Sequence, residues 1–137
     1  MQSITLKGRK IVDGCCKAEA LVSIKPLSFL GGVNPANGKI VDKNHDLYGE
    51  SIRDRVLCFP YGHGSTVGSY VLYSLTKNKL APKAILNQTA DPVVVVGAII
   101  ADIPMIDQID IRQIRTGDFL EVNASTGLVK ILKRRER

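Results

Sequence analysis

RVLCFPYGHGSTVGSYVLYSL, residues 55–75, carries the main architectural signal of the sequence. Its beginning, RVLCFP, is an apolar run suited to a short buried strand. Glycines follow at positions 62, 64 and 68, and apolar residues then recur at the spacing of one helix face, at Val67, Tyr70, Val71 and Leu75. We expect Ser65 or Thr66 to cap this helix, with Pro82 beyond its end. The segment therefore predicts a strand, a glycine-rich turn and a helix.

Strand signals lie on both sides of this segment. SITLKGRKIV (3–12) alternates polar and apolar residues, which indicates a half-buried strand or a hairpin with Gly8 at its break. EALVSI (19–24) predicts a strand that Pro26 stops. Further strands are expected at KAILN (83–87), MIDQI (105–109), FLEVN (119–123) and LVKIL (128–132), the last two joined as a hairpin near Gly127.

The run VVVVGAIIAD after Asp91-Pro92 gives two conflicting signals. Its valines favour a strand, whereas Asp before Pro is a typical helix start. We predict a short buried helix. The chain then reads as an α+β domain, a β-rich shell with two central helices.

The stretch from Leu27 to Tyr48 shows no clear periodicity and contains several Gly, Asn and Pro residues. Compact domains seldom carry so long a structureless connection unless it has a role. Two interpretations stay open. The stretch is either a surface Ω-loop or disordered insert, or a loop that binds a ligand or partner.

Length and composition fit one ordinary domain. The chain has 137 residues, of which 45% are hydrophobic and 23% charged, and this excludes disordered and fibrous classes. The longest apolar stretch, 93–101, is too short to span a membrane. The opening MQSITLKGRK lacks the apolar core of a signal peptide, so we expect a cytoplasmic protein.

The formal net charge of +6 is concentrated near the C-terminus. Residues 128–137 hold five basic side chains and one acidic one, which gives +4 of the total. Because short basic tails are usually solvated, we expect no nucleic-acid binding. The predicted organisation is a single domain over 1–127, followed by a final strand and basic tail over 128–137.

Cysteine and histidine are too few and too scattered for a metal site in this chain. Cys15 and Cys16 are adjacent, Cys58 is isolated, and no Cys or His pair has zinc-site or cluster spacing. We therefore predict no metal ligands here and expect the three cysteines to be structural, as small buried hydrophobes.

The glycine-rich turn is the one concentrated chemical signal. Glycines that lead into a helix expose backbone N–H groups, which favour an anion. The turn matches neither a P-loop, nor G-x-G-x-x-G, nor G-x-S-x-G. Ser65 and Thr66 serve either as simple caps or as site residues, and His63 is either a ligand contact or an ordinary turn residue.

Four pieces between Gly8 and Asp118 resemble the small, swivel-domain subunits of the aconitase X family, which include archaeal phosphomevalonate dehydratases. In chain order they are EALV (19–22), PLSFLGGVNP (26–35), GHGSTVGSYVL (62–72) and the run from Asp91-Pro92 through VGAIIA (96–101). Together they span about four-fifths of the chain, and the LSF-x-GGV and G-x-GS-x-x-GS patterns are quite specific.

The resemblance implies a swivelling β/β/α domain and a role in a heterodimeric hydro-lyase. Such enzymes dehydrate (R)-5-phosphomevalonate to trans-anhydromevalonate 5-phosphate, and the large catalytic subunit holds the 4Fe-4S cluster. The family's proton-accepting serine corresponds to Ser65. Its arginine between the two glycines is replaced by His63 here, which puts charge pairing at that position in doubt. The expected substrate-binding residues are Ser28, Gly31, Gly32, His63, Gly64 and Thr66.

Two other functions remain open from the sequence. The chain is also similar to the small subunit of a hydroxyproline dehydratase of the same family. A stand-alone module that binds an anion or small ligand without catalysis is the alternative from another class.

Overall fold

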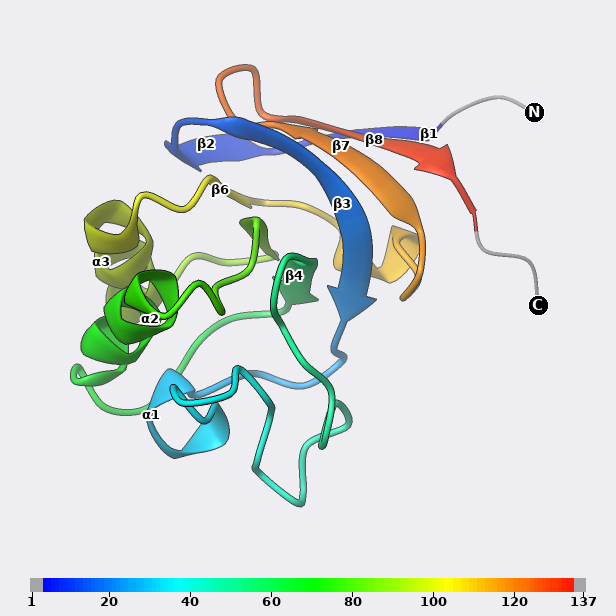
Figure 1. The fold of residues 1–137 in the computed structure, drawn as a ribbon. Helices are drawn as coiled ribbons and strands as arrows, with labels where there is room; N and C mark the ends of the chain where they lie inside the picture. The colour runs from blue at the N-terminus through cyan, green and yellow to red at the C-terminus, as the bar shows by residue number, and fades with distance from the viewer. Residues whose placement is uncertain (1–3, 135–137) are drawn as a thin grey trace.

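The computed structural model describes residues 4–134, and Figure 1 shows curved strands with the helices on one side of them. The strands are β1 (Ile4–Lys7), β2 (Arg9–Val12), β3 (Cys15–Val22), β4 (Val56–Phe59), β5 (Ala84–Asn87), β6 (Met105–Asp107), β7 (Phe119–Asn123) and β8 (Leu128–Lys133). The helices are α1 (Phe29–Gly32), α2 (Gly68–Lys77) and α3 (Pro92–Ala101), with a 3₁₀ turn at Ile111–Gln113. The α+β class and the β-rich shell are confirmed.

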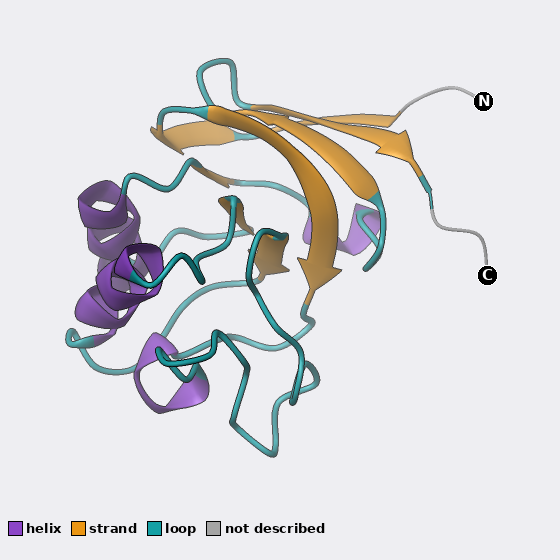
Figure 2. Cartoon of the chain, in the orientation of Figure 1, coloured by secondary structure: helices purple, strands orange, loops and turns teal. Residues whose placement is uncertain are grey.

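The long strand β3 pairs with strands of two β layers, and Figure 2 shows that it is strongly curved. Its first part, Cys15–Glu19, pairs antiparallel with β7, which with β8 and β1 forms the antiparallel layer. Its last part, Ala20–Val22, pairs with β4, and β4, β5 and β6 continue in parallel to form the parallel layer, with β2 antiparallel at its edge. The carboxyl ends of three parallel strands, β3, β4 and β5, therefore lie side by side.

The opening segment is divided between the two layers at Gly8. β1 pairs with β8 and β2 pairs with β6, so the hairpin alternative is wrong. A Cβ atom at Gly8 would collide with the backbone carbonyl of Asp107. Glycine is thus required where the chain passes from one layer to the other.

Alternate residues of the parallel layer enter two different cores. Val56 and Cys58 of β4 pack between the two β layers, whereas Leu57 and Phe59 pack against the helices. This double burial explains why the parallel strands are continuous apolar runs instead of alternating ones. The antiparallel layer, the parallel layer and the helices confirm the β/β/α arrangement.

The run after Asp91-Pro92 is a helix, as predicted. The Asp91 side chain accepts a hydrogen bond from Val94 N at 2.9 Å, with Pro92 in the first helical position. The N-cap contact and the proline therefore outweigh the strand preference of the valines.

The predicted buried face of the other long helix is partly wrong. Val71 and Leu75 are buried, but Val67 and Tyr70 are 48% and 67% exposed, and Leu72 is buried in their place. Val67 precedes the first residue of α2, Gly68, and Tyr70 faces an open groove between α2 and α3, so neither side chain enters the core. The central helices are also accompanied by the short α1.

The aperiodic segment from Leu27 to Tyr48 is an ordered part of the helix-side core. Its apolar side chains are buried there, namely Leu27, Phe29, Val33, Ile40 and Leu47. Backbone hydrogen bonds also fold it on itself, such as Val41 N to the Gly32 carbonyl at 2.9 Å. The segment is therefore not a disordered surface insert.

The C-terminal strand β8 lies between β1 and β7 in the antiparallel layer. The end of the basic tail, residues 135–137, lies outside the described residues, and the division of the chain at residue 127 stays a prediction. Among residues 4–134, no helix has the length and apolar character needed to cross a bilayer.

Candidate functional site

The segments that follow β3, β4 and β5 meet at one edge of the parallel layer. Leu27 and Gly62 form an isolated parallel bridge there, and Gly62 also approaches Asp91, which follows β5. The edge beyond the carboxyl ends of parallel strands is the usual ligand site in open α/β sheets. We call the turn from Gly62 to Val67, which leads into α2, the glycine turn.

Two backbone hydrogen bonds fasten the start of the glycine turn to Leu27. Leu27 N donates to the Tyr61 carbonyl at 3.2 Å, and His63 N donates to the Leu27 carbonyl at 3.1 Å. The Leu27 backbone thus sets how far the turn extends beyond β4.

Close approach explains two of the glycines. A Cβ atom at Gly62 would lie 2.8 Å from Asp91 Oδ1 and would collide with Val94 Cγ2. Gly64 has φ of +98° and lies directly against Ser28 Oγ. Any larger residue at either position would strain the turn.

Ser65 is exposed at the tip of the glycine turn, and its Oγ accepts a hydrogen bond from Val67 N at 3.2 Å. The predicted capping is wrong. The helix begins at Gly68, and the cap residue Val67 makes no side-chain cap. The helix amides bond instead to the carbonyls of the turn, such as Gly68 N to Ser65 O at 2.9 Å.

Three successive amides of the turn are left without a partner. Within residues 4–134, the N–H groups of Gly64, Ser65 and Thr66 donate no hydrogen bond, and all three residues are exposed. Adjacent unpaired amides at a helix start favour a negatively charged group. Ser65 thus lies in a run of unpaired amide donors, a feature that favours an anion.

The other predicted site residues are only partly brought together. Ser28 is half-buried against Gly64, and its Oγ donates to the Leu30 carbonyl at 2.9 Å. His63 and Gly31 are exposed, the latter in open space, whereas Gly32 is buried beside Leu27. The structure places Ser28 at the glycine turn but does not place Gly32 on the open side of the site. Their roles in binding stay predictions.

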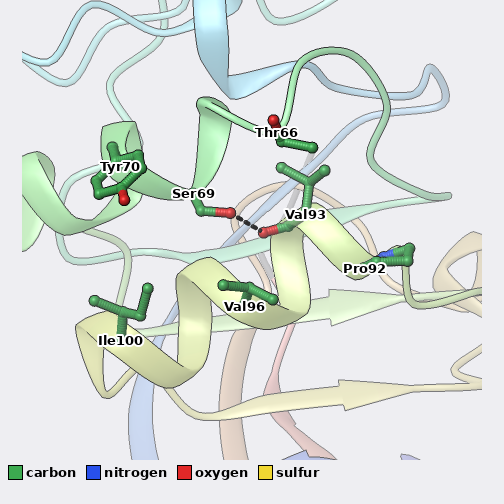
Figure 3. A pocket seen from close by; sticks show the side chains of 7 residues that line it. All are labelled: Thr66, Ser69, Tyr70, Pro92, Val93, Val96 and Ile100. Carbon is green, nitrogen blue, oxygen red and sulfur yellow. Dashed lines mark hydrogen bonds between the residues drawn. The ribbon is translucent and has the colours of Figure 1, made fainter.

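An apolar groove beside the turn was missed by the sequence analysis. Figure 3 shows it between α2 and α3, where Ser69 Oγ donates to the Val93 carbonyl at 2.9 Å. The groove has a volume of about 240 Å³ and is lined by Thr66, Ser69, Tyr70, Pro92, Val93, Val96 and Ile100. The sequence did contain an indication of this groove, the all-apolar sequence of α3. A surface helix without a polar face must expose some apolar side chains.

The cysteines of this chain do not fit an iron–sulfur cluster. Within residues 4–134, no group of three Cys, His, Asp or Glu side chains is placed to hold a metal. Burial raises the pKa of Cys16 to about 11 and raises that of Cys58 as well, which disfavours the thiolate form that binds iron. Cys58 is buried and Cys16 is half-buried, but Cys15 is exposed, so the expected burial of all three cysteines is wrong for Cys15 and only partly right for Cys16.

Thiol alkylation should follow the order Cys15, then Cys16, then Cys58. At pH 8 only about one thousandth of Cys16 is thiolate if its pKa is about 11, and Cys58 is fully buried. Iodoacetamide labelling of the native chain with peptide mass spectrometry measures this order. Because the pKa of Cys16 is raised, its labelling should keep rising between pH 8 and 11. Rapid labelling of Cys58 without unfolding would contradict the expectation.

Comparison with known proteins gives one family. Residues 5–131 match the family model of the aconitase X swivel domain. The phosphomevalonate dehydratase small subunit of Thermococcus sibiricus is 54% identical over 126 residues, which cover 92% of this chain and 97% of that protein. The protein of the same name from Methanocaldococcus jannaschii is 51% identical over 129 residues, with 94% and 98% covered.

A solved structure agrees with this result. The crystal structure of holo-form Thermococcus kodakaraensis aconitase X contains a chain that superposes with a TM-score of 0.93 at 52% sequence identity. The match covers 95% of this chain and 99% of that one.

Proposed function

This chain belongs to the aconitase X swivel-domain family, and from that membership we propose that it is the small subunit of a heteromeric dehydratase. Its substrate is (R)-5-phosphomevalonate and its product trans-anhydromevalonate 5-phosphate, in a cytoplasmic mevalonate route to isoprenoids. The relatives named above, which are phosphomevalonate dehydratase small subunits, support this substrate over hydroxyproline.

The observation that carries the proposal is the exposed hydroxyl of Ser65 beside unpaired amides. Ser65 lies on the surface, and the described residues offer neither a general base in hydrogen-bond contact with its Oγ nor a metal-binding group. Such a site is one half of an active site. The other half must come from a surface that closes over the glycine turn.

Ser65 accepts the proton that leaves the substrate carbon in the proposed reaction. The C–H electron pair forms the new double bond, the C–O bond breaks, and the departing hydroxide takes a proton from solvent to become water. Ser65 then returns the proton that it accepted to solvent, which restores the alkoxide for the next turnover. A serine hydroxyl is a weak base at neutral pH, so the reactive form is the alkoxide. The amides of Gly64, Ser65 and Thr66 stabilise that negative charge through their dipoles.

Assistance to the leaving hydroxyl is assigned to the partner. We propose that the large subunit holds a 4Fe-4S cluster, which supplies Lewis-acid assistance when bound. This chain contributes no ligand to it in the proposal, because no group of three Cys, His, Asp or Glu side chains within residues 4–134 is placed to hold a metal. His63 stands where the family usually has arginine, so the permanent positive charge of that arginine is absent here. We therefore assign the attraction of this chain for the anionic substrate mainly to the unpaired amides.

Reconstitution tests the proposed function. The purified chain alone should not consume phosphomevalonate, whereas anaerobic mixing with its cluster-bearing large subunit should produce the anhydro product, as measured by mass spectrometry. Hydroxyproline serves as the competing substrate in a parallel reaction.

Three results would contradict the proposal in different ways. Turnover of hydroxyproline alone would assign the chain to the related dehydratase. Tight binding of an anionic ligand by the isolated chain, with no turnover by the reconstituted pair, would favour a non-catalytic binding module. Activity of the isolated chain would remove the need for a split site.

A further inference from the structure

A polar cluster outside the proposed active site ties the end of β3 to the turn at residues 44–47. Its members Ser23 and His45 are only 1% and 7% exposed. Ser23 Oγ donates to Asp46 Oδ1 at 2.6 Å, and Ile24 N donates to Asp46 Oδ2 at 2.9 Å. Buried polar groups that are this fully paired hold their surroundings in one arrangement.

The imidazole of His45 contacts the backbone on two sides. Its Nε2 lies 3.1 Å from the Pro26 carbonyl oxygen, and Leu47 N donates to its Nδ1 at 3.1 Å. Because a carbonyl can only accept, the Pro26 contact requires a proton on Nε2. Nδ1 also lies 3.1 Å from Asp46 Oδ1, and Nε2 lies 3.3 Å from Ser23 Oγ.

The residue after Pro26 is the one that fastens the glycine turn. Leu27 makes both backbone hydrogen bonds to Tyr61 and His63, and Ser28 then packs against Gly64. A shift of the Pro26 carbonyl therefore displaces the Leu27 backbone, to which the glycine turn is bonded. One of these bonds is made by His63, two residues before Ser65.

We propose that His45 is a positioning residue for the reaction of Ser65. Its Nε2–H holds the Pro26 carbonyl, which fixes the Leu27 backbone and, through it, the position of the glycine turn. His45 is only 7% exposed, and its role is to hold the backbone behind the turn. The inference rests on the proposed function of Ser65 as proton acceptor, but the structural coupling can be measured without it.

Two substitutions separate the contacts of His45. His45→Gln keeps an amide donor at the reach of Nε2, whereas His45→Asn keeps an acceptor for Leu47 N but is too short to reach Pro26. In the reconstituted enzyme we expect His45→Asn to lower kcat about 100-fold with KM within about threefold, since small misplacements cost rate. His45→Gln should stay within about fivefold of the wild type. Equal losses in both variants, or a greater loss for Gln, would overturn the inference.

Amide hydrogen exchange of residues 60–68 gives a readout that does not depend on catalysis. In the full chain, His45→Asn should speed exchange at His63 N at least tenfold, and His45→Gln should leave it unchanged. If this pattern appears but the wild-type pair does not turn over phosphomevalonate, the proposed function fails and the coupling stands. If the wild type is active and His45→Asn changes neither exchange nor kcat, the coupling is wrong.

A second variant tests the next link, the packing of the glycine turn on the segment after Pro26, if His45→Asn fails to fold. Gly64→Ala places a Cβ against Ser28 Oγ at a φ of +98°, and so pushes the turn from the segment after Leu27. It should lower kcat at least tenfold and speed exchange in residues 60–68. Wild-type kcat and exchange in this variant would overturn the inference.

Discussion

Ser65→Ala should abolish turnover while leaving the heteromer intact. Proton transfer by a positioned side chain contributes about 10²–10⁴-fold, so we expect kcat to fall about 10³-fold or more. The Ser65 side chain is exposed, and its one hydrogen bond is accepted from Val67 N at 3.2 Å, so its loss should hardly affect folding. Steady-state turnover after anaerobic reconstitution measures the effect, and size-exclusion chromatography measures assembly.

Ser74→Ala is the matched control for this substitution. Ser74 lies on α2, the helix that follows the glycine turn, and is only partly exposed. Its variant should keep kcat within about twofold of the wild type, because surface substitutions away from the site are usually silent. Substantial turnover by Ser65→Ala would show that another group accepts the proton. Loss of the complex in that variant would instead assign Ser65 to assembly.

The elements that could be predicted from the sequence are those whose signals are local. β4, β5 and β7 are runs of apolar or alternating residues, and α3 starts at an Asp-Pro pair. The pairing of β1 and β2 could not be predicted, because alternation around Gly8 is the same in a hairpin and in a crossing between layers. That choice depends on β8 and β6, which lie about a hundred residues later.

The candidate site was also predictable only where its sequence signals are local. The glycine turn could be found because three glycines within seven residues exceed what a simple cap needs. The cap was misassigned because the Ser65 hydroxyl bonds Val67 N, two residues away, before the helix begins. The contact between His45 and Pro26 could not be predicted, because residues 19 apart without periodicity give no sign that they meet.

Gly62→Ala should damage both stability and catalysis. Its Cβ would lie 2.8 Å from Asp91 Oδ1 and collide with Val94 Cγ2, where Asp91 caps α3. Either the glycine turn moves outward or the cap is disturbed, and overpacking of this kind costs about 1–3 kcal/mol. An outward shift displaces Ser65, so kcat should fall about 10–100-fold. Urea denaturation and reconstituted turnover measure the two effects.

Gly32→Ala separates this collision from the general effect of replacing glycine. Alanine restricts the unfolded chain equally in both variants, and this effect alone stabilises the folded state by about 0.4–1 kcal/mol. The difference in unfolding free energy between the two variants therefore reports the contact in the folded state. At Gly32 the nearest atom to the new Cβ would be Leu27 Cδ1 at 3.8 Å, an ordinary distance. Equal unfolding free energies would mean that the glycine turn does not press on Asp91. If Gly62→Ala lowers stability but leaves kcat unchanged, the contact between Gly62 and Asp91 holds α3 but does not position Ser65.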